Sequence, residues 1–189
     1  MQMRFLPLLG LGWYYGWILL CVWWTIQGLS LILQPRDVRK RLFELNRSSW
    51  PKKTRVLFAT GKVVALIFLV VAAFSPIHLN SIEFLVGIVV FVIGLIGLVG
   101  ALWNFKNTPL DSPVSVGLYK VSRHPQLLMQ LVIGIGLSIA LSSWLLLILR
   151  LASFGLEHPG VIAEENECLE RFGESYKKYL ERVPRYLLV

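Results

Sequence analysis

The sequence has 189 residues, of which 56% are hydrophobic and only 16% are charged, and its mean hydropathy is +0.64. This composition excludes a soluble globular domain and indicates an integral membrane protein with several membrane-crossing helices. The formal net charge of +8 does not indicate nucleic-acid binding, because the basic residues lie between apolar runs, where membrane topology explains them. Cys21 and Cys168 stand far apart and indicate neither a disulfide framework nor a metal site.

Three apolar runs in the first part of the chain predict transmembrane helices. They cover about residues 5–33, 56–79 and 84–103, and each is long enough to cross most of the roughly 30 Å hydrocarbon core. The segment 34–55 carries eight Lys or Arg residues and two acidic ones. We therefore expect it in the cytoplasm, close to the anionic headgroups of membrane lipids. The segment 75–83 has no Lys or Arg and is expected outside, together with the N-terminus.

A fourth apolar run, residues 126–156, predicts a helical hairpin. A single helix across it would carry the basic C-terminal tail outside, against the positive-inside rule. Two helices of about 15 residues each, turning at Ser142 and Ser143, return the tail to the cytoplasm and reach only about 23 Å each. The tail, residues 161–183, predicts an amphipathic helix because its apolar side chains recur at helical spacing.

The predicted fold class is therefore all-α. It is a polytopic membrane bundle of about five transmembrane helices, the last two of which form the hairpin, with a cytoplasmic C-terminal amphipathic helix. Residues 1–104 hold the first three helices and the basic loop. Residues 105–189 hold the loop, hairpin and tail that we expect to form the functional region.

A polar stretch, residues 117–125, leads directly into the fourth apolar run. Pro125 suits the first turn of a helix, so Arg123 and His124 are expected at the open N-terminus, where an anion is favoured. Further along, Gly134 and Gly136 remove side chains from the helix surface, roughly 13 Å from Pro125. An elongated ligand with a carboxylate at one end would fit this span.

The second half of the chain carries two motifs that together resemble one family. They are Gly117-x-Tyr119-x-x-x-Arg123-His124-Pro125 and a tail with Glu164-Glu165, Phe172-Gly173, Tyr176, Tyr179 and Val183-Pro184-Arg185. The pair resembles the isoprenylcysteine carboxyl methyltransferase and phospholipid methyltransferase group of membrane enzymes. The resemblance covers roughly residues 111–185, and the earlier residues match only in being apolar helices.

This resemblance implies an S-adenosylmethionine site on the cytoplasmic side, closed by the tail, with a lipid-like methyl acceptor entering from the bilayer. It places Val114, Tyr119, the run His124, Pro125, Gln126 and Leu127, and Glu164 at the cofactor. We add Arg123 for the methionine carboxylate, Gly134 and Gly136 for close approach of the adenosine part, and Glu165 as an alternative to Glu164 for an amine or ribose hydroxyls. No catalytic acid or base is predicted, because the sulfonium is already an activated donor.

Three positions depart from the family. Leu127, Met129 and Gly160 stand where it commonly has Tyr, Gly and Arg, so the acceptor site is expected to differ. His158 is a candidate replacement for the absent Arg, with an ordinary helix-start residue as the alternative.

Each candidate site residue also has a purely structural interpretation. Arg123 and His124 would then be interfacial anchors, the glycines helix-packing positions, and Glu164 and Glu165 a helix start favoured by the helix dipole. Two other functions stay open. One is an NADPH-dependent sterol or enoyl-type reductase, since those enzymes have a similar tail, and the other is a catalytically silent membrane partner protein.

Overall fold

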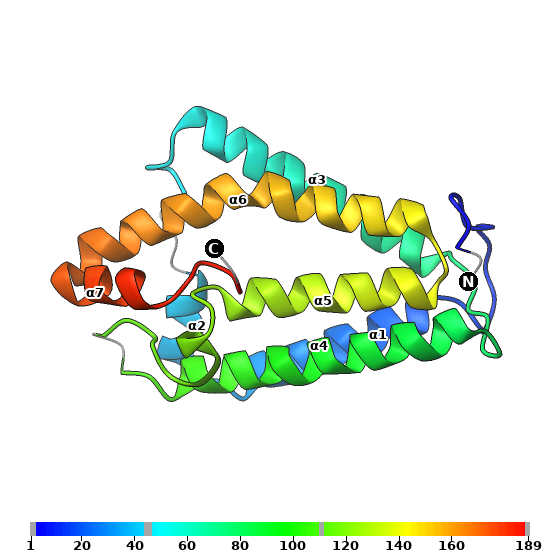
Figure 1. Cartoon of the computed structure of the whole chain (residues 1–189), viewed down its shortest axis with the longest axis horizontal. Helices are drawn as coiled ribbons and strands as arrows, with labels where there is room; N and C mark the ends of the chain where they lie inside the picture. The colour runs from blue at the N-terminus through cyan, green and yellow to red at the C-terminus, as the bar shows by residue number, and fades with distance from the viewer. Residues whose placement is uncertain (1–2, 44–46, 110–111, 188–189) are drawn as a thin grey trace.

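The computed structural model describes residues 3–43, 47–109 and 112–187, and the described part of the chain is helical, with no β-strand beyond two isolated bridges. The helices run along the long axis of the molecule or cluster at one of its ends (Figure 1). They are α1 (Trp17–Ile32), α2 (Arg36–Phe43), α3 (Lys52–Ala73), α4 (Ile82–Lys106), the 3₁₀ helix η1 (Gly117–Lys120), α5 (Pro125–Ala140), α6 (Trp144–Phe172) and α7 (Glu174–Arg182).

The helices that could cross a membrane form the long part of the molecule. Among the described residues, α3, α4 and α6 are long and apolar enough to do so, while α1 and α5 are shorter apolar helices of 16 residues each. The prediction of an all-helical chain is confirmed for the described residues, and three of their helices are candidate membrane spans. The short elements α2, η1 and α7 gather at one end, and the opposite end consists of turns and the N-terminal segment (Figure 1).

The first helix is shorter than the sequence predicted. We expected it over residues 5–33, but α1 begins only at Trp17. The residues before α1 lie against the turn between α5 and α6 and pair with its backbone. Arg4 N–H donates to Ser142 O at 2.8 Å, and Trp144 N–H donates to Arg4 O at 3.0 Å. Pro7 and nearby glycines disfavour helix here, and pairing with this turn satisfies the backbone instead.

The predicted hairpin turn is confirmed, but its second helix is much longer than expected. Ser142 adopts φ 52°, and the Ser143 hydroxyl caps α6 by accepting from Leu146 N–H at 3.3 Å. Helix α6 then runs for 29 residues, through Pro159, instead of about 15. Helix α6 packs along α3, and Gly160, the residue after Pro159, is buried against Phe58 of α3. This tertiary packing keeps the helix continuous past the proline, whose missing N–H costs one helical hydrogen bond.

The tail is therefore not one helix over residues 161–183, as we expected. Its first half is the end of α6, and the chain breaks at Gly173, whose φ of 54° favours glycine, before α7 begins. The other boundaries also shift, since α3 ends at Ala73 before Ser75 and Pro76 and α4 extends to Lys106.

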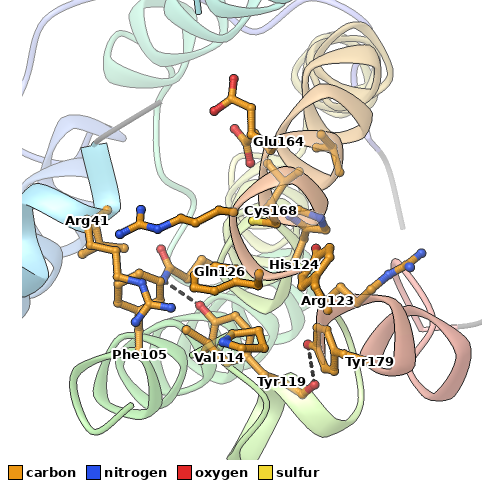
Figure 2. A pocket seen from close by; sticks show the side chains of 18 of the residues that line it. Arg41, Phe105, Val114, Tyr119, Arg123, His124, Gln126, Glu164, Cys168 and Tyr179 are labelled. Carbon is orange, nitrogen blue, oxygen red and sulfur yellow. Dashed lines mark hydrogen bonds between the residues drawn. The ribbon is translucent and has the colours of Figure 1, made fainter. Parts of the chain in front are cut away.

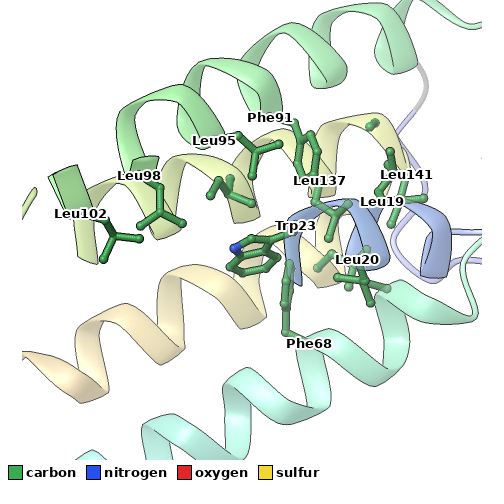
Figure 3. Close-up of a cluster of buried hydrophobic side chains, with 14 residues drawn as sticks. Leu19, Leu20, Trp23, Phe68, Phe91, Leu95, Leu98, Leu102, Leu137 and Leu141 are labelled. Carbon is green, nitrogen blue, oxygen red and sulfur yellow. The ribbon is translucent and has the colours of Figure 1, made fainter. Parts of the chain in front are cut away.

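Two tightly packed helix pairs make up the bundle. Helix α3 packs on α6, α4 packs on α5, and α1 lies against both α3 and α4. Their shared core is drawn in Figure 3, where Trp23, Phe68, Phe91 and Leu137 meet from four different helices. Gly87 and Gly94 of α4 serve this packing, because a Cβ atom on either would collide with the backbone of α5, at Ala140 and Ile133 respectively.

Gly136 offers a direct test of this close packing. A Cβ atom there would collide with the backbone N of Phe91, so Gly136→Ala should lower the free energy of unfolding by about 1–3 kcal/mol. Gly155 on α6 has no neighbouring atom within 4 Å of a Cβ position, and Gly155→Ala should be neutral or stabilise by up to about 1 kcal/mol. Thermal unfolding of the two variants in detergent checks this, and equal shifts would contradict the packing.

Candidate functional site

A cavity of about 460 Å³ lies at the end of the bundle that carries α2, η1 and α7 (Figure 2). Its volume is in the range of sites that bind small molecules and cofactors. The walls combine aromatic, apolar and charged side chains from α2 to α7. They are Arg41, Leu42, Arg47, Phe58, Lys62, Phe105, Pro113, Val114, Tyr119, Arg123, His124, Gln126, Leu127, Gln130, Glu157, Val161, Glu164, Glu167, Cys168, Arg171, Phe172, Tyr176 and Tyr179.

Most of the residues predicted for the cofactor meet at this cavity. Those on its walls are Val114, Tyr119, Arg123, His124, Gln126, Leu127 and Glu164. Pro125 lies just behind them at the first position of α5. Segments that are far apart in the sequence are thus brought to one place, while the cofactor-binding role of these residues stays a prediction.

Helix α5 begins at the cavity as the sequence predicted. Pro125 is its first residue, His124 is its N-cap, and the described side chains provide no capping hydrogen bond at this end. The first free backbone N–H groups, those of Gln126 and Leu127, therefore have no side-chain acceptor. A helix start of this kind favours an anionic group in the cavity.

Glu165 lies behind the cavity wall and links both motifs. Its Oε1 is 3.1 Å from Arg123 Nε and 3.2 Å from His124 Nε2, and its Oε2 accepts from Arg185 Nε at 3.0 Å and Nη2 at 2.7 Å. The Glu165 side chain is only 5% exposed. One carboxylate thus faces two guanidinium groups and an imidazole, and the local charge stays positive.

The C-terminal segment is attached to the start of α5 by further hydrogen bonds. Arg123 N–H donates to Pro184 O at 3.0 Å, and the Ser122 hydroxyl donates to Arg185 O at 3.0 Å. Beyond them, the Tyr186 hydroxyl lies 3.0 Å from His158 Nδ1 on α6. The candidate role of His158 as a replacement cation in the site is therefore not supported by its position, because it binds Tyr186 and does not line the cavity.

Two tyrosines of the cavity wall link α7, η1 and the start of α5 by hydrogen bonds. Tyr179 hydroxyl donates to Tyr119 O at 2.7 Å, and Gln126 Nε2 donates to the Tyr119 hydroxyl at 2.9 Å (Figure 2). Burial raises the pKa of both phenols well above its usual value. Both hydroxyls therefore stay protonated over the physiological pH range and act as neutral hydrogen-bonding groups.

Glu164 and Glu165 are neighbours in the sequence but point to different places. Glu164 lines the cavity, whereas Glu165 is bound by Arg185 and the start of α5. Two further carboxylates of the cavity wall are bound by neighbouring side chains. Lys62 Nζ donates to Glu157 Oε2 at 2.8 Å, and Trp50 Nε1 donates to Glu167 Oε1 at 2.5 Å. Of the two predicted carboxylates, Glu164 is thus the one that lies on the cavity wall.

Gly134 and Gly136 do not reach the cavity, which corrects the expectation of a groove beside them. A Cβ atom on Gly134 would meet the Arg150 side chain of α6, and one on Gly136 would meet the backbone of α4. Both glycines serve close helix packing, the structural alternative given above. Gly160 likewise packs against Phe58 and Trp50 and leaves no room for a larger side chain.

Several cavity residues were missed by sequence reasoning. Arg41 and Arg47 were interpreted only as topology signals, although both line the cavity. Glu157 carried a usable signal, because it lies seven residues before Glu164 and therefore on the same face of one long helix. That signal was hidden by the expectation that the helix ends before the tail.

The bonds of Glu165 predict its importance for folding. Glu165→Gln leaves Arg123 and Arg185 without their carboxylate, and breaking such a buried pair should cost about 3–5 kcal/mol of unfolding free energy. Glu174→Gln is the matched control, because Glu174 is 69% exposed and its ion pair with Lys177 is long at 3.9 Å. This change should alter the free energy of unfolding by less than about 0.5 kcal/mol. Thermal unfolding separates the two, and a small effect of Glu165→Gln would contradict this role.

Comparison with known proteins adds the family. The model of a family described as "Protein of unknown function (DUF1295)" matches residues 17–183. Neither the curated proteins nor the solved structures contain a match to this chain. The matched residues extend from the start of α1 to the end of α7 and include the cavity residues named above, so the chain belongs to the DUF1295 family.

Proposed function

We propose that this protein is an integral membrane methyltransferase that uses S-adenosylmethionine to methylate a lipid-like or small amphipathic acceptor. The observation that carries the proposal is the meeting of two distant motifs at one cavity. Arg123 and His124 from the first motif and Glu164 from the second line the same space of about 460 Å³. The resemblance of these motifs to membrane methyltransferases supports this function over others.

The cavity offers a partner for each part of this cofactor. The uncapped N–H groups at the start of α5, with the positive charge around Arg123, suit the methionine carboxylate. Glu164 suits the amine or the ribose hydroxyls. The ring of Tyr119 on the cavity wall would provide a π-face that attracts a sulfonium cation.

The protein's task in such a transfer is mainly alignment. The cofactor supplies an activated methyl group, and the chain would hold donor and acceptor in line and exclude water from them. Apolar side chains such as Leu127 and Val161 line the cavity between its polar groups. They suit the apolar part of an acceptor that arrives from the bilayer.

A second candidate, a membrane NADPH-dependent reductase of sterol or enoyl type, is favoured by the cations of the cavity. Arg41, Arg47, Lys62 and Arg171 all line it, and phosphate groups are commonly bound by such side chains. Arg41 nevertheless donates to Pro109 O at 2.8 Å and Ser112 O at 2.6 Å. Because its guanidinium already holds the loop before η1, we prefer the methyltransferase.

The proposal includes a membrane arrangement. Helices α1, α3, α4, α5 and α6 would cross the bilayer, with the cavity and α7, as the amphipathic C-terminal helix, on the cytoplasmic side and the N-terminus outside. The end that carries α2 and α7 holds most of the basic residues, which supports this orientation.

The arrangement predicts the location of both ends of the bundle. A reporter fused to the C-terminus should report the cytoplasm, and one inserted near Asn80, between α3 and α4, should report the outside. Reporter activity in intact cells measures both. A C-terminus found outside would exclude a cytoplasmic cofactor site.

Ligand-induced stabilisation tests the cofactor. A ligand that binds only the folded state raises the free energy of unfolding by about 2.7 kcal/mol at a hundredfold excess over Kd. S-adenosylhomocysteine should therefore raise the melting temperature of the protein in detergent, and NADPH should not. Stabilisation by NADPH alone would support the reductase, and none by either ligand, in a sample shown to be folded, would support the silent partner.

Glu164→Gln should remove most of the rise in melting temperature caused by S-adenosylhomocysteine, because a charge-assisted hydrogen bond contributes roughly 1–3 kcal/mol to binding. Glu170→Gln on the exposed side of α6 is the matched control and should keep it. An unchanged affinity in Glu164→Gln would remove Glu164 from the site.

A further inference from the structure

An exposed apolar surface lies at the end of the bundle opposite the cavity. It belongs to the N-terminal segment, residues 4–16, which precedes α1 and lies beside the turn between α5 and α6 (Figure 1). Leu11 and Trp13 are each 83% exposed. A contiguous apolar surface of this kind marks a site that contacts a membrane or a partner. The other large exposed side chains of the segment are Phe5, Leu6, Leu8, Leu9 and Tyr14.

The backbone of the N-terminal segment is bound to the ends of neighbouring helices. Gly10 N–H donates to Phe74 O at 3.0 Å, at the C-terminal end of α3. Phe5 O accepts from Leu145 N–H at 3.2 Å in the first turn of α6, next to the two backbone bonds of Arg4 described above. The main chain is therefore held by the protein, while the exposed apolar side chains face outward.

Helix α1 is too short to cross the hydrocarbon core of a bilayer by itself. Its 16 residues reach about 24 Å, whereas the core is about 30 Å thick. No residue from Phe5 to Leu33 is charged, so the N-terminal segment and α1 form one continuous uncharged stretch. The apolar side chains of the segment can therefore cover the part of the membrane that α1 does not reach.

Aromatic side chains from other helix ends are exposed beside this segment. Trp17 starts α1, Phe74 follows α3 and Trp144 starts α6, and all three are exposed. The indole Nε1 of Trp17 also donates to Gly12 O at 3.0 Å. Aromatic residues of this kind are enriched at the interface between membrane and water. Their origin from three helix ends favours a bilayer, which contacts all helix ends at one level, over a partner that contacts one of them.

We propose that the N-terminal segment lies in the interfacial region of one membrane leaflet, with its apolar side chains inserted between the lipids. The interface fits this segment better than the hydrocarbon core does, because a non-helical backbone would leave costly unpaired groups in hydrocarbon. Arg4, which is exposed at the start of the segment, would reach the phosphate groups of the lipids. The inference rests on the membrane arrangement proposed above and is independent of any methyltransferase activity.

Spin labels test the surroundings of this segment directly. A nitroxide is attached at Leu11→Cys or, in a second protein, at Leu8→Cys, after the free cysteines Cys21 and Cys168 have been replaced by Ser. In lipid vesicles, oxygen concentrates among the acyl chains, whereas a nickel chelate stays in water. Both labels should therefore show a several-fold higher ratio of oxygen to nickel collisions than a label at Glu174→Cys on the exposed surface of α7.

A label at Val22→Cys, on the exposed face of α1, provides the membrane reference. If Val22→Cys is in lipid while Leu8→Cys and Leu11→Cys have the ratio of Glu174→Cys, the segment lies in water and the proposal is overturned. If Val22→Cys itself has the ratio of Glu174→Cys, the membrane arrangement fails and the proposal fails with it. Neither result depends on S-adenosylhomocysteine, whose effect on melting tests the methyltransferase separately.

A second copy of the chain is the alternative occupant of this surface. Nanodiscs that hold one protein copy each exclude it, and the high oxygen-to-nickel ratio at Leu8→Cys and Leu11→Cys should persist there. A ratio that falls to the value of Glu174→Cys in such discs would overturn the proposal in favour of contact between copies. Low collision rates with both reagents would show burial against protein and would also overturn it. Circular dichroism checks the folding of each variant, and if one labelled variant does not fold, the other decides.

Discussion

The ion pairs of the Glu165 carboxylate are the interaction on which the cavity end of the molecule depends. This carboxylate binds the start of α5 through Arg123 and His124 and the C-terminal segment through Arg185. These groups lie on three segments that the sequence separates by up to 62 residues, from Arg123 to Arg185. Among the described residues, no other side chain forms ion pairs with all three. Neighbouring residues on a helix point about 100° apart, so Glu165 binds these groups behind the wall while Glu164 lines the cavity.

Features determined by local physics could be predicted from the sequence. Pro125 starts α5 because its fixed φ and missing N–H suit a first helical turn. The turn at Ser142 and Ser143 followed from the charge of the tail, since only a hairpin returns the basic residues to the side of the first basic loop. Most of the predicted cavity residues meet because the start of α5 and the second half of α6 lie at the same end of the bundle.

Features determined by tertiary packing could not be predicted in this way. Pro159 and Gly160 look like a helix boundary, yet burial of Gly160 against α3 keeps α6 continuous. In the sequence, Gly134 and Gly136 are equally compatible with a ligand groove and with close helix packing. Only the neighbouring helices show that they are packing positions. The sequence also could not show that Arg41 turns back to the loop before η1.

Helix α6 is continuous, so it connects the apolar part of the bundle with the cavity. Its positions 150, 157 and 164 lie on one face because seven residues make nearly two helical turns. Along this face Arg150 is buried in the apolar bundle, Glu157 lines the cavity and binds Lys62, and Glu164 lines the cavity two turns further on. Had the helix ended at Pro159, Glu164 would belong to a separate segment and its position would not be fixed relative to the membrane helices. A ligand that reaches the cavity from the bilayer would therefore meet charges held in register by a single helix.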